Sequence, residues 1–201
     1  ANMGIIYTSS PVFIVILSVF LFSEKISLNR IVGLIICLIG VITIITKGNF
    51  NYLINFSFTT GDFWMLGAAI GWALYSIYLL KWKSKFSLMG RFTLIAFFGF
   101  ISLFPFYILE ESLFFNTKFN STFLAWVLFA AISPGIIAFS LYTKVQRYLG
   151  ASLTGFTLYL FAVYGAIFGI ILFEEMLLPF HYYGGALVFA GVYIARKIKT
   201  I

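Results

Sequence analysis

Few side chains in this chain could carry out acid–base or metal chemistry. Its 201 residues include six carboxylates, one histidine and one cysteine. The central part of each apolar segment lacks Asp, Glu, Lys and Arg, so the residues do not indicate a proton relay built on buried carboxylates. Asp62 is the single aspartate and His181 lies near a helix end, which disfavours a magnesium-dependent transferase and a hydrolytic triad. We expect no catalytic residue, no metal site, no disulfide and no cofactor.

Hydroxyl and aromatic side chains are better candidates, because they could bind a weakly polar solute. Trp72, Tyr75 and Ser76 are three and four residues apart, which places them on one face of a helix. Packing is the alternative role for such rings, and bonding to carbonyls of the same helix is the alternative for the hydroxyls. The predicted solute-binding residues are Tyr7, Ser9, Ser10, Trp72, Tyr75, Ser76, Ser133, Pro134, Ser140, Thr154 and Thr157.

Proline and glycine mark positions where helices could bend or approach each other. Pro134 removes a backbone hydrogen bond near the centre of an apolar segment, and such breaks often form transporter sites; a packing kink is the alternative. Gly67 and Gly71 have the GxxxG spacing that permits close approach of another helix. The predicted structural or gating residues are Pro11, Glu24, Gly67, Gly71, Gly165, Gly169 and Glu175.

A segment with a glutamate in a turn occurs twice, at an offset of 151 residues. Glu24 is followed by Gly33 and Gly40, and Glu175 is followed by Gly184 and Gly191. Apolar helices share Leu, Ile and Val by chance, whereas composition does not dictate this glutamate–glycine spacing. The pattern predicts an internal repeat. Each glutamate could cap the next helix or pair with a basic neighbour such as Lys25 or Arg30, with gating as the alternative role.

Composition requires a membrane as the solvent. Hydrophobic residues make up 62% of the chain and charged residues 9%, and several apolar stretches exceed the roughly 18 residues typical of a transmembrane helix. The stretches are continuously apolar, which disfavours the alternating strands of a barrel. Seven helical spans are predicted, at 3–22, 30–46, 62–81, 91–109, 122–143, 151–173 and 180–195.

Basic residues orient these spans. Eleven of the 13 Lys and Arg residues fall on one side of the predicted topology, and only Lys47 and Lys118 fall on the other. The basic side and the C-terminus are therefore predicted to be cytoplasmic. The net charge of +7 follows from this topology, so no nucleic-acid partner is expected.

Orientation and repetition together predict a larger protein. The second hairpin follows three further spans, so we expect three spans to precede the first hairpin as well. Two units of five helices would then have opposite orientations, and a substrate path is expected where such units meet. The predicted divisions are a closing hairpin at 1–48, a linker at 49–61 and a complete second repeat at 62–197.

The residues also resemble a known family. SPVFIVILSVFLFSEKISLNRIVGLIICLIGVITII (Ser10–Ile45) looks like the closing hairpin of an EamA domain of the drug/metabolite transporter superfamily. GDFWMLGAAIGWALYSIYLLKWKSK (Gly61–Lys85) is similar to the opening helix of that family's second repeat. Pro11 has Ala162 as its counterpart, so segment 151–173 is predicted to lack the break that the family often has there.

The sequence thus predicts an all-α polytopic membrane protein, with seven transmembrane helices from an inverted 5+5 repeat. The resemblance implies a permease of the inner or plasma membrane that moves a metabolite, amino acid or drug-like solute by alternating access, commonly as an exporter. A structural or assembly membrane protein is the alternative, and an enzyme is disfavoured. The expected partners are the solute and the lipid bilayer, and a homodimer is left open.

Overall fold

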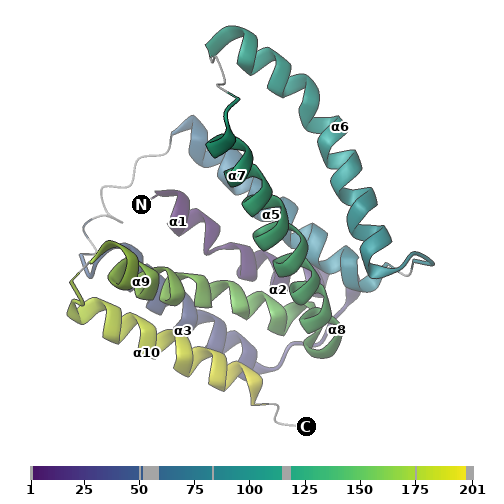
Figure 1. Ribbon diagram of the computed structural model, residues 1–201. Helices are drawn as coiled ribbons and strands as arrows, with labels where there is room; N and C mark the ends of the chain where they lie inside the picture. Colours follow the sequence, from purple (N-terminus) through teal and green to yellow (C-terminus); the bar gives the residue numbers. More distant parts are fainter. Residues whose placement is uncertain are drawn as a thin grey trace. The chain divides into compact units, whose positions relative to one another are not determined.

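The computed structural model describes residues 2–49, 51, 59–82, 84–114, 119–174 and 176–197 of the chain, and these residues form helices and their connections (Figure 1). Most helices are α-helical, and two segments have other windings: η1 is a π-helix and η2 is a 3₁₀-helix. The elements in chain order are α1 Asn2–Tyr7, α2 Ser10–Phe22, α3 Leu28–Ile45, α5 Thr60–Lys81, α6 Leu88–Phe114, α7 Ser121–Ala130, η1 Ala131–Ala138, α8 Phe139–Gly155, η2 Phe156–Tyr159, α9 Leu160–Phe173 and α10 Pro179–Arg196.

Five stretches are long and apolar enough to cross a membrane: Met3–Phe22, Leu28–Ile45, Thr60–Lys81, Met89–Leu109 and Ser121–Phe173. The sequence predicts seven spans, and the difference arises in two places. Ser121–Phe173 is one continuous helical run of 53 residues, although Gly150 has non-helical angles within it (φ 81°, ψ 168°). The helix α10 is not among the candidate spans, and its His181, three tyrosines and Arg196 lower its hydropathy.

The described residues divide into two compact units. One unit contains residues 1–81 and 146–201, and the other contains residues 82–145. The first unit holds α1, α2, α3, α5, η2, α9 and α10, together with the last part of α8. Its core is formed by side chains of α2, α3, η2, α9 and α10, among them Val15, Cys37, Tyr159 and Val188. The second unit holds α6, α7, η1 and the first part of α8.

The helices that precede the two repeated glutamates end in the same backbone conformation. The helix α2 ends at Ser23, which has left-handed angles (φ 49°, ψ 36°). The helix α9 ends at Glu174, with φ 54° and ψ 29°. These two residues lie 151 positions apart, at the offset of the sequence repeat. Two non-glycine residues in this sparsely populated region stop equivalent helices at equivalent positions.

The helices α3 and α10 cross so closely that their backbones touch (Figure 1). A Cβ atom placed on Gly33 would lie 2.5 Å from the Gly191 carbonyl oxygen, and one on Gly40 would lie 2.7 Å from that of Gly184. Only glycine leaves room for such contacts. The pairing of an early residue in one helix with a late residue in the other shows that α3 and α10 are antiparallel.

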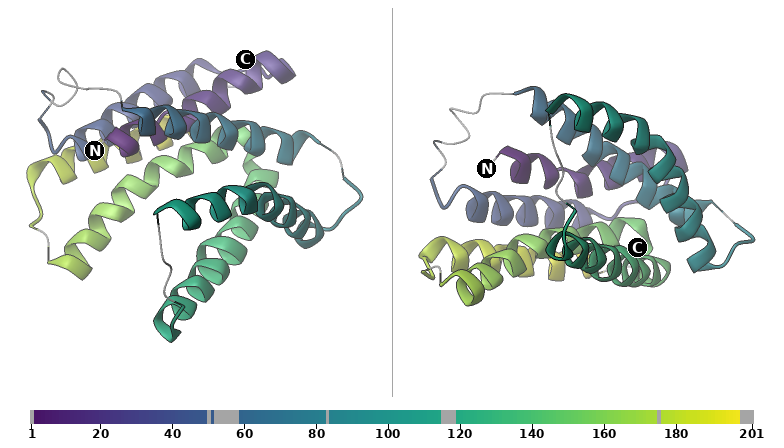
Figure 2. Two further views of the ribbon diagram at one scale, coloured as in Figure 1. Left: turned by 90° about the horizontal axis from the view of Figure 1, so that it is seen from above. Right: turned by 45° about the horizontal axis from the view of Figure 1, so that its top comes forward.

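The crossing also relates the two repeat copies to each other. At the repeat offset Gly33 corresponds to Gly184 and Gly40 to Gly191. In the structure Gly33 packs against Gly191, and Gly40 packs against Gly184. At the middle, the Cys37 thiol donates to the Val188 carbonyl at 3.4 Å, and these residues are themselves 151 positions apart. The contacts across the crossing are therefore reciprocal. The right-hand view of Figure 2 shows α3 running beside α9 and α10.

Candidate functional site

The first polar segment of the sequence falls where a helix is interrupted. The helix α1 ends at Tyr7 and α2 begins at Ser10, one residue before Pro11. The hydroxyls of Thr8 and Ser9 donate to the carbonyls of Ile5 and Ile6, at 2.6 and 2.5 Å. The Ser9 hydroxyl therefore bonds a nearby backbone carbonyl, which is the structural alternative to binding a solute. Tyr7 is half-buried and Ser10 is buried.

A change of helix winding also occurs near the corresponding place in the second hairpin segment, which has no proline there. The 3₁₀ turn η2 covers Phe156–Tyr159, which corresponds to residues 5–8 at the repeat offset. Ala162, the counterpart of Pro11, lies inside the regular helix α9, so the absence of a break at that position stays a prediction and the change of winding lies a few residues earlier. Thr154 and Thr157 donate to the carbonyls of Gly150 and Thr154, both at 2.7 Å. Tightened winding and these hydroxyl bonds, rather than proline, make the helix irregular here.

The predicted face of α5 is present. The rings of Trp72 and Tyr75 lie 5.6 Å apart at 42°, and Ser76 is completely buried one residue further on. The Ser76 carbonyl accepts a hydrogen bond of 2.5 Å from Nε2 of Gln146, which is 1% exposed. Gln146 thereby joins α8 to α5, and sequence reasoning missed it because the residue lies between Lys144 and Arg147, in a stretch assigned to a loop.

Four buried hydroxyls in the first unit have no hydrogen-bond partner among the described residues. They belong to Ser10 and Ser18 on α2, Ser152 on α8 and Tyr159 on η2, and none is more than 1% exposed. The sequence pointed only to Ser10. A buried hydroxyl without a partner costs about 1–3 kcal/mol, so each one calls for an explanation.

The elements that carry these groups are in contact with one another. The helix α2 packs against α5 and η2. A Cβ atom on Gly155, between Ser152 and Tyr159 in the chain, would lie 3.7 Å from Cα of Pro11. We call Ser10, Ser18, Ser76, Gln146, Ser152, Thr154 and Tyr159 the buried polar set. The set carries no charged side chain, and it can offer hydrogen bonds only.

Pro134 lies in the second unit, inside the π-helix η1. Proline cannot donate to the carbonyl four residues earlier, so wider winding at this point has a direct cause. Single π-helical turns are frequent at functional sites. Ser133 and Ser140 are half-buried beside this turn and in the following helix. The relation of these three residues to the buried polar set remains a prediction.

The glycines predicted to allow helix approach have different surroundings. A Cβ atom on Gly67, Gly71 or Gly165 would meet no atom within 4 Å among the described residues. The GxxxG spacing on α5 is therefore not occupied by a described helix. The close crossing uses Gly33, Gly40, Gly184 and Gly191 instead. Their seven-residue spacing was visible only as part of the repeat.

Polar residues at the helix ends have structural partners. Oε1 of Glu24 lies 3.5 Å from Nη1 of Arg30, which confirms that this glutamate pairs with a basic neighbour. Thr59 donates through its backbone N–H and its hydroxyl to Oδ2 of Asp62, at 2.8 and 2.9 Å, so Asp62 caps α5. The Leu178 N–H donates to Nδ1 of His181 at 3.1 Å. Glu175 lies outside the described residues.

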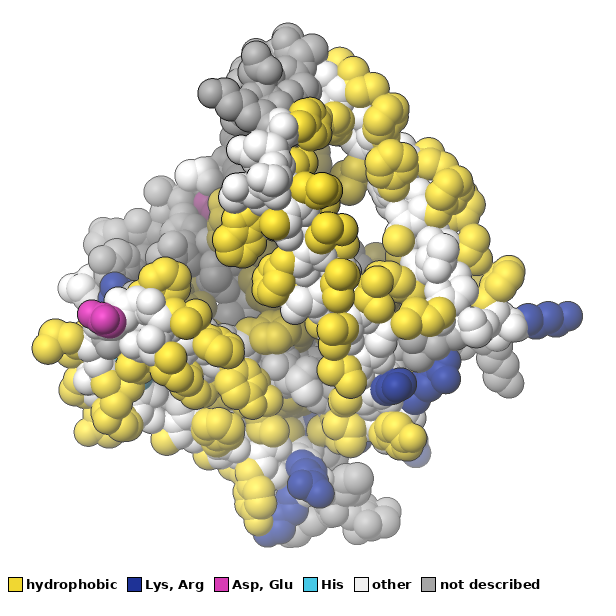
Figure 3. Space-filling model, in the orientation of Figure 1, with side chains coloured by type: hydrophobic (Ala, Val, Ile, Leu, Met, Phe, Trp, Pro, Cys, Tyr) yellow, Lys and Arg dark blue, Asp and Glu magenta, His cyan; other side chains and the backbone are white. Residues whose placement is uncertain are grey.

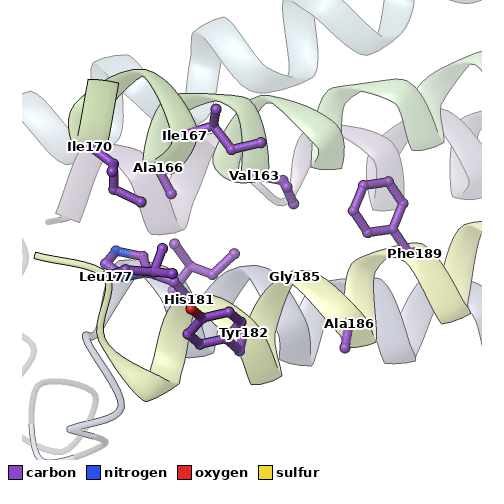
Figure 4. Close-up of a pocket in the computed structure, with 11 residues that line it drawn as sticks. Val163, Ala166, Ile167, Ile170, Leu177, His181, Tyr182, Gly185, Ala186 and Phe189 are labelled. Carbon is purple, nitrogen blue, oxygen red and sulfur yellow. The ribbon is translucent and has the colours of Figure 1, made fainter. Parts of the chain in front are cut away.

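A shallow apolar groove runs between α9 and α10 and has a volume of about 240 Å³ (Figure 4). Val163, Ala166 and Ile170 face it from α9, and His181 and Gly185 face it from α10. None of the predicted solute-binding residues lines this groove. Its walls are mostly apolar, and His181 and Tyr182 are the residues of the lining that have polar side-chain atoms.

Long apolar helices with an exposed hydrophobic surface define an integral membrane protein. Figure 3 shows such side chains covering much of one face of the molecule. The chain belongs to the EamA-like transporter family, whose model matches residues 1–46 and 59–196. This membership confirms the resemblance to EamA domains of the drug/metabolite transporter superfamily.

Two curated relatives are similar over nearly the whole chain. An uncharacterized transporter of Methanothermobacter thermautotrophicus is 25% identical over 196 residues, which are 96% of this chain and 55% of the relative. The uncharacterized transporter YetK of Bacillus subtilis is 26% identical over 191 residues, with 95% and 58% covered. The chain thus spans little more than half the length of these relatives. One protein of known crystal structure has the same fold, with a TM-score of 0.74 and 19% identity over 97% of this chain and 66% of the other.

Proposed function

We propose that this chain forms part of a permease that moves a small, uncharged or weakly polar organic solute across the cell membrane by alternating access, with export as the direction. Membership of a transporter family supports transport in general. The finer proposal rests on one observation, the four buried hydroxyls that lack partners. A folded protein tolerates unpaired buried groups where they serve a function. Hydroxyls that form hydrogen bonds with a bound solute would serve such a function.

The irregular helices support movement around these hydroxyls. Two irregular segments, at residues 8–9 and 156–159, lie close to corresponding positions at the repeat offset and are near residues of the buried polar set. Non-helical backbone at membrane depth is tolerated where it is buried in protein or lines a cavity. Helix breaks at which two repeats meet are the usual place for a substrate site in transporters with inverted repeats. The antiparallel crossing of α3 and α10 supports the inverted arrangement.

Removing a hydroxyl from the buried polar set tests the proposal. Tyr159→Phe should raise the free energy of unfolding by up to about 3 kcal/mol, because it deletes a buried group without a partner. The same change should slow solute uptake into liposomes that contain the full-length protein. Thr46→Val is the matched control, since its buried hydroxyl already donates to the Ile42 carbonyl at 2.8 Å. It should leave transport unchanged.

A loss of stability in Tyr159→Phe would show that its hydroxyl has a structural partner. Stabilisation with unchanged transport would remove Tyr159 from the site. If Ser10→Ala also stabilised the protein and left transport unchanged, the buried polar set would not bind the solute.

Topology needs a separate test. Single cysteines introduced by Ser84→Cys and Asn120→Cys in a Cys37→Ser background should react from the cytoplasm and from outside, respectively, because basic loops stay in the cytoplasm. Serine fits the position of Cys37, where a hydroxyl could donate to the Val188 carbonyl as the thiol does. The opposite labelling would overturn the proposed orientation of the C-terminus.

A further inference from the structure

A second groove lies at the basic end of α10, within the first unit. Its volume is about 280 Å³, and it is bounded by the C-terminal part of α8, by η2, by the start of α9 and by the last turns of α10. The walls include Leu149, Leu153, Phe156, Leu160 and Val192, and Arg196 closes one end. This volume is below the roughly 300–1,000 Å³ of pockets for drug-sized ligands, so the groove is poorly suited to enclosing a solute.

Arg196 is the single charged side chain of this groove. Thr157 is also part of the lining, and its hydroxyl donates a hydrogen bond to the Thr154 carbonyl. No described carboxylate lies within ion-pair distance of Arg196; Glu24 is paired with Arg30 instead. The groove therefore combines a long apolar wall with one cation that the described protein does not neutralise.

The C-terminal end of α10, which carries Arg196, is bonded to α3. Nδ2 of Asn29 donates to the Lys197 carbonyl at 2.6 Å, which ties the end of α10 to the start of α3. Lys197 adds a second exposed cation next to Arg196. Figure 3 shows Lys and Arg side chains near this end of the first unit.

We propose that this groove binds one anionic phospholipid, with an acyl chain along the apolar wall and the phosphate on the guanidinium of Arg196. A guanidinium matches a phosphate with two parallel hydrogen bonds. Basic pockets between transmembrane helices on the cytoplasmic side are suited to anionic headgroups. A zwitterionic lipid is a poorer fit, because its ammonium group would approach Arg196 with no carboxylate in the lining to receive it. The proposal depends on membrane insertion and is independent of transport.

Native mass spectrometry of the full-length protein in detergent tests this proposal. Phosphatidylglycerol and phosphatidylethanolamine with identical acyl chains are added in turn, and the affinities are compared. The parent protein should prefer phosphatidylglycerol. Arg196→Gln should reduce that preference on the order of fivefold, and Arg196→Lys should retain part of it. Lys197→Gln is the matched control, because it removes the same charge one residue away, outside the groove, and should have a smaller effect.

Filling the groove tests the acyl chain separately from the charge. Leu153→Trp keeps Arg196 and should weaken binding of phosphatidylglycerol while the protein stays monodisperse. Soluble glycerol phosphate should compete poorly, since it lacks the chain. Equal affinities for the two lipids in the parent, equal losses in Arg196→Gln and Lys197→Gln, or undiminished binding by Leu153→Trp would each overturn the proposal. Occupation of the groove by other helices of the full-length protein would give the first of these results.

Discussion

The crossing of α3 and α10 and the buried polar set occupy the same unit, yet they follow opposite rules. At the crossing, glycine backbones touch and the Cys37 thiol has a hydrogen-bond partner. In the buried polar set, four hydroxyls lack a partner among the described residues, and the helices around them are irregular. Helices whose backbones are in contact can pack in one way only. Hydroxyls without a partner, in helices of irregular winding, can form hydrogen bonds with different groups in different conformations. We therefore expect the crossing to stay rigid and the residues around the unpaired hydroxyls to move.

Substituting a glycine at the crossing should have the largest effect. In Gly40→Ala the new Cβ would lie 2.7 Å from the Gly184 carbonyl oxygen and 2.9 Å from the Val188 nitrogen, and neither backbone atom can move away freely. We expect a loss of about 3 kcal/mol or more in the free energy of unfolding, at the upper end of the range for overpacking. Equilibrium unfolding in detergent and the yield of folded protein measure it.

Gly67→Ala is the control for that experiment. Its Cβ meets no described atom within 4 Å, and alanine favours a helix over glycine by about 1 kcal/mol, so stability should hold or rise slightly. A Gly40→Ala protein as stable as the parent would mean that the two helices do not cross this closely.

Replacing Pro134 should give the next largest effect and extends the comparison to the second unit. Pro134→Ala restores a donor to the helix and should raise stability by up to about 3 kcal/mol, while transport slows because the π-helical turn is lost. Pro105→Ala is the matched control, because Pro105 lies inside α6 without a change of winding. Unit-by-unit stability comes from proteolysis or unfolding, and transport from uptake into liposomes. If both variants transport normally, Pro134 is a packing kink.

The α5 face should give the smallest effect. Trp72→Ala should weaken apparent solute affinity by about 1–3 kcal/mol if the ring contacts the solute, and Leu74→Ala, on another side of the helix, should change it little. Solute binding and uptake by the full-length protein are measured beside folded yield. Equal losses of affinity in the two variants would indicate general destabilisation, and Trp72 would then not be part of the solute site. A loss confined to Leu74→Ala would place the solute on the other side of α5.

Local information in the sequence was sufficient for much of this molecule. Hydropathy predicted the helices, the bounds of α3, α5 and α10 agree with prediction within two residues, and the motifs led to the correct family. The pairing of Glu24 with Arg30 was also accessible, because the two residues are six positions apart and join the ends of consecutive helices. Spacing along one helix likewise placed Trp72 beside Tyr75.

Contacts between distant segments required the tertiary structure. The repeat made Gly33, Gly40, Gly184 and Gly191 conspicuous, but only the packed helices show that they touch one another, while the GxxxG pair on α5 meets no described helix. Gln146 and Tyr159 gained their significance from burial and from partners present or missing, which no local pattern encodes. The reason is physical: hydropathy and helix periodicity are properties of neighbours in the chain, whereas a hydrogen bond lacking its partner is a property of the folded interior.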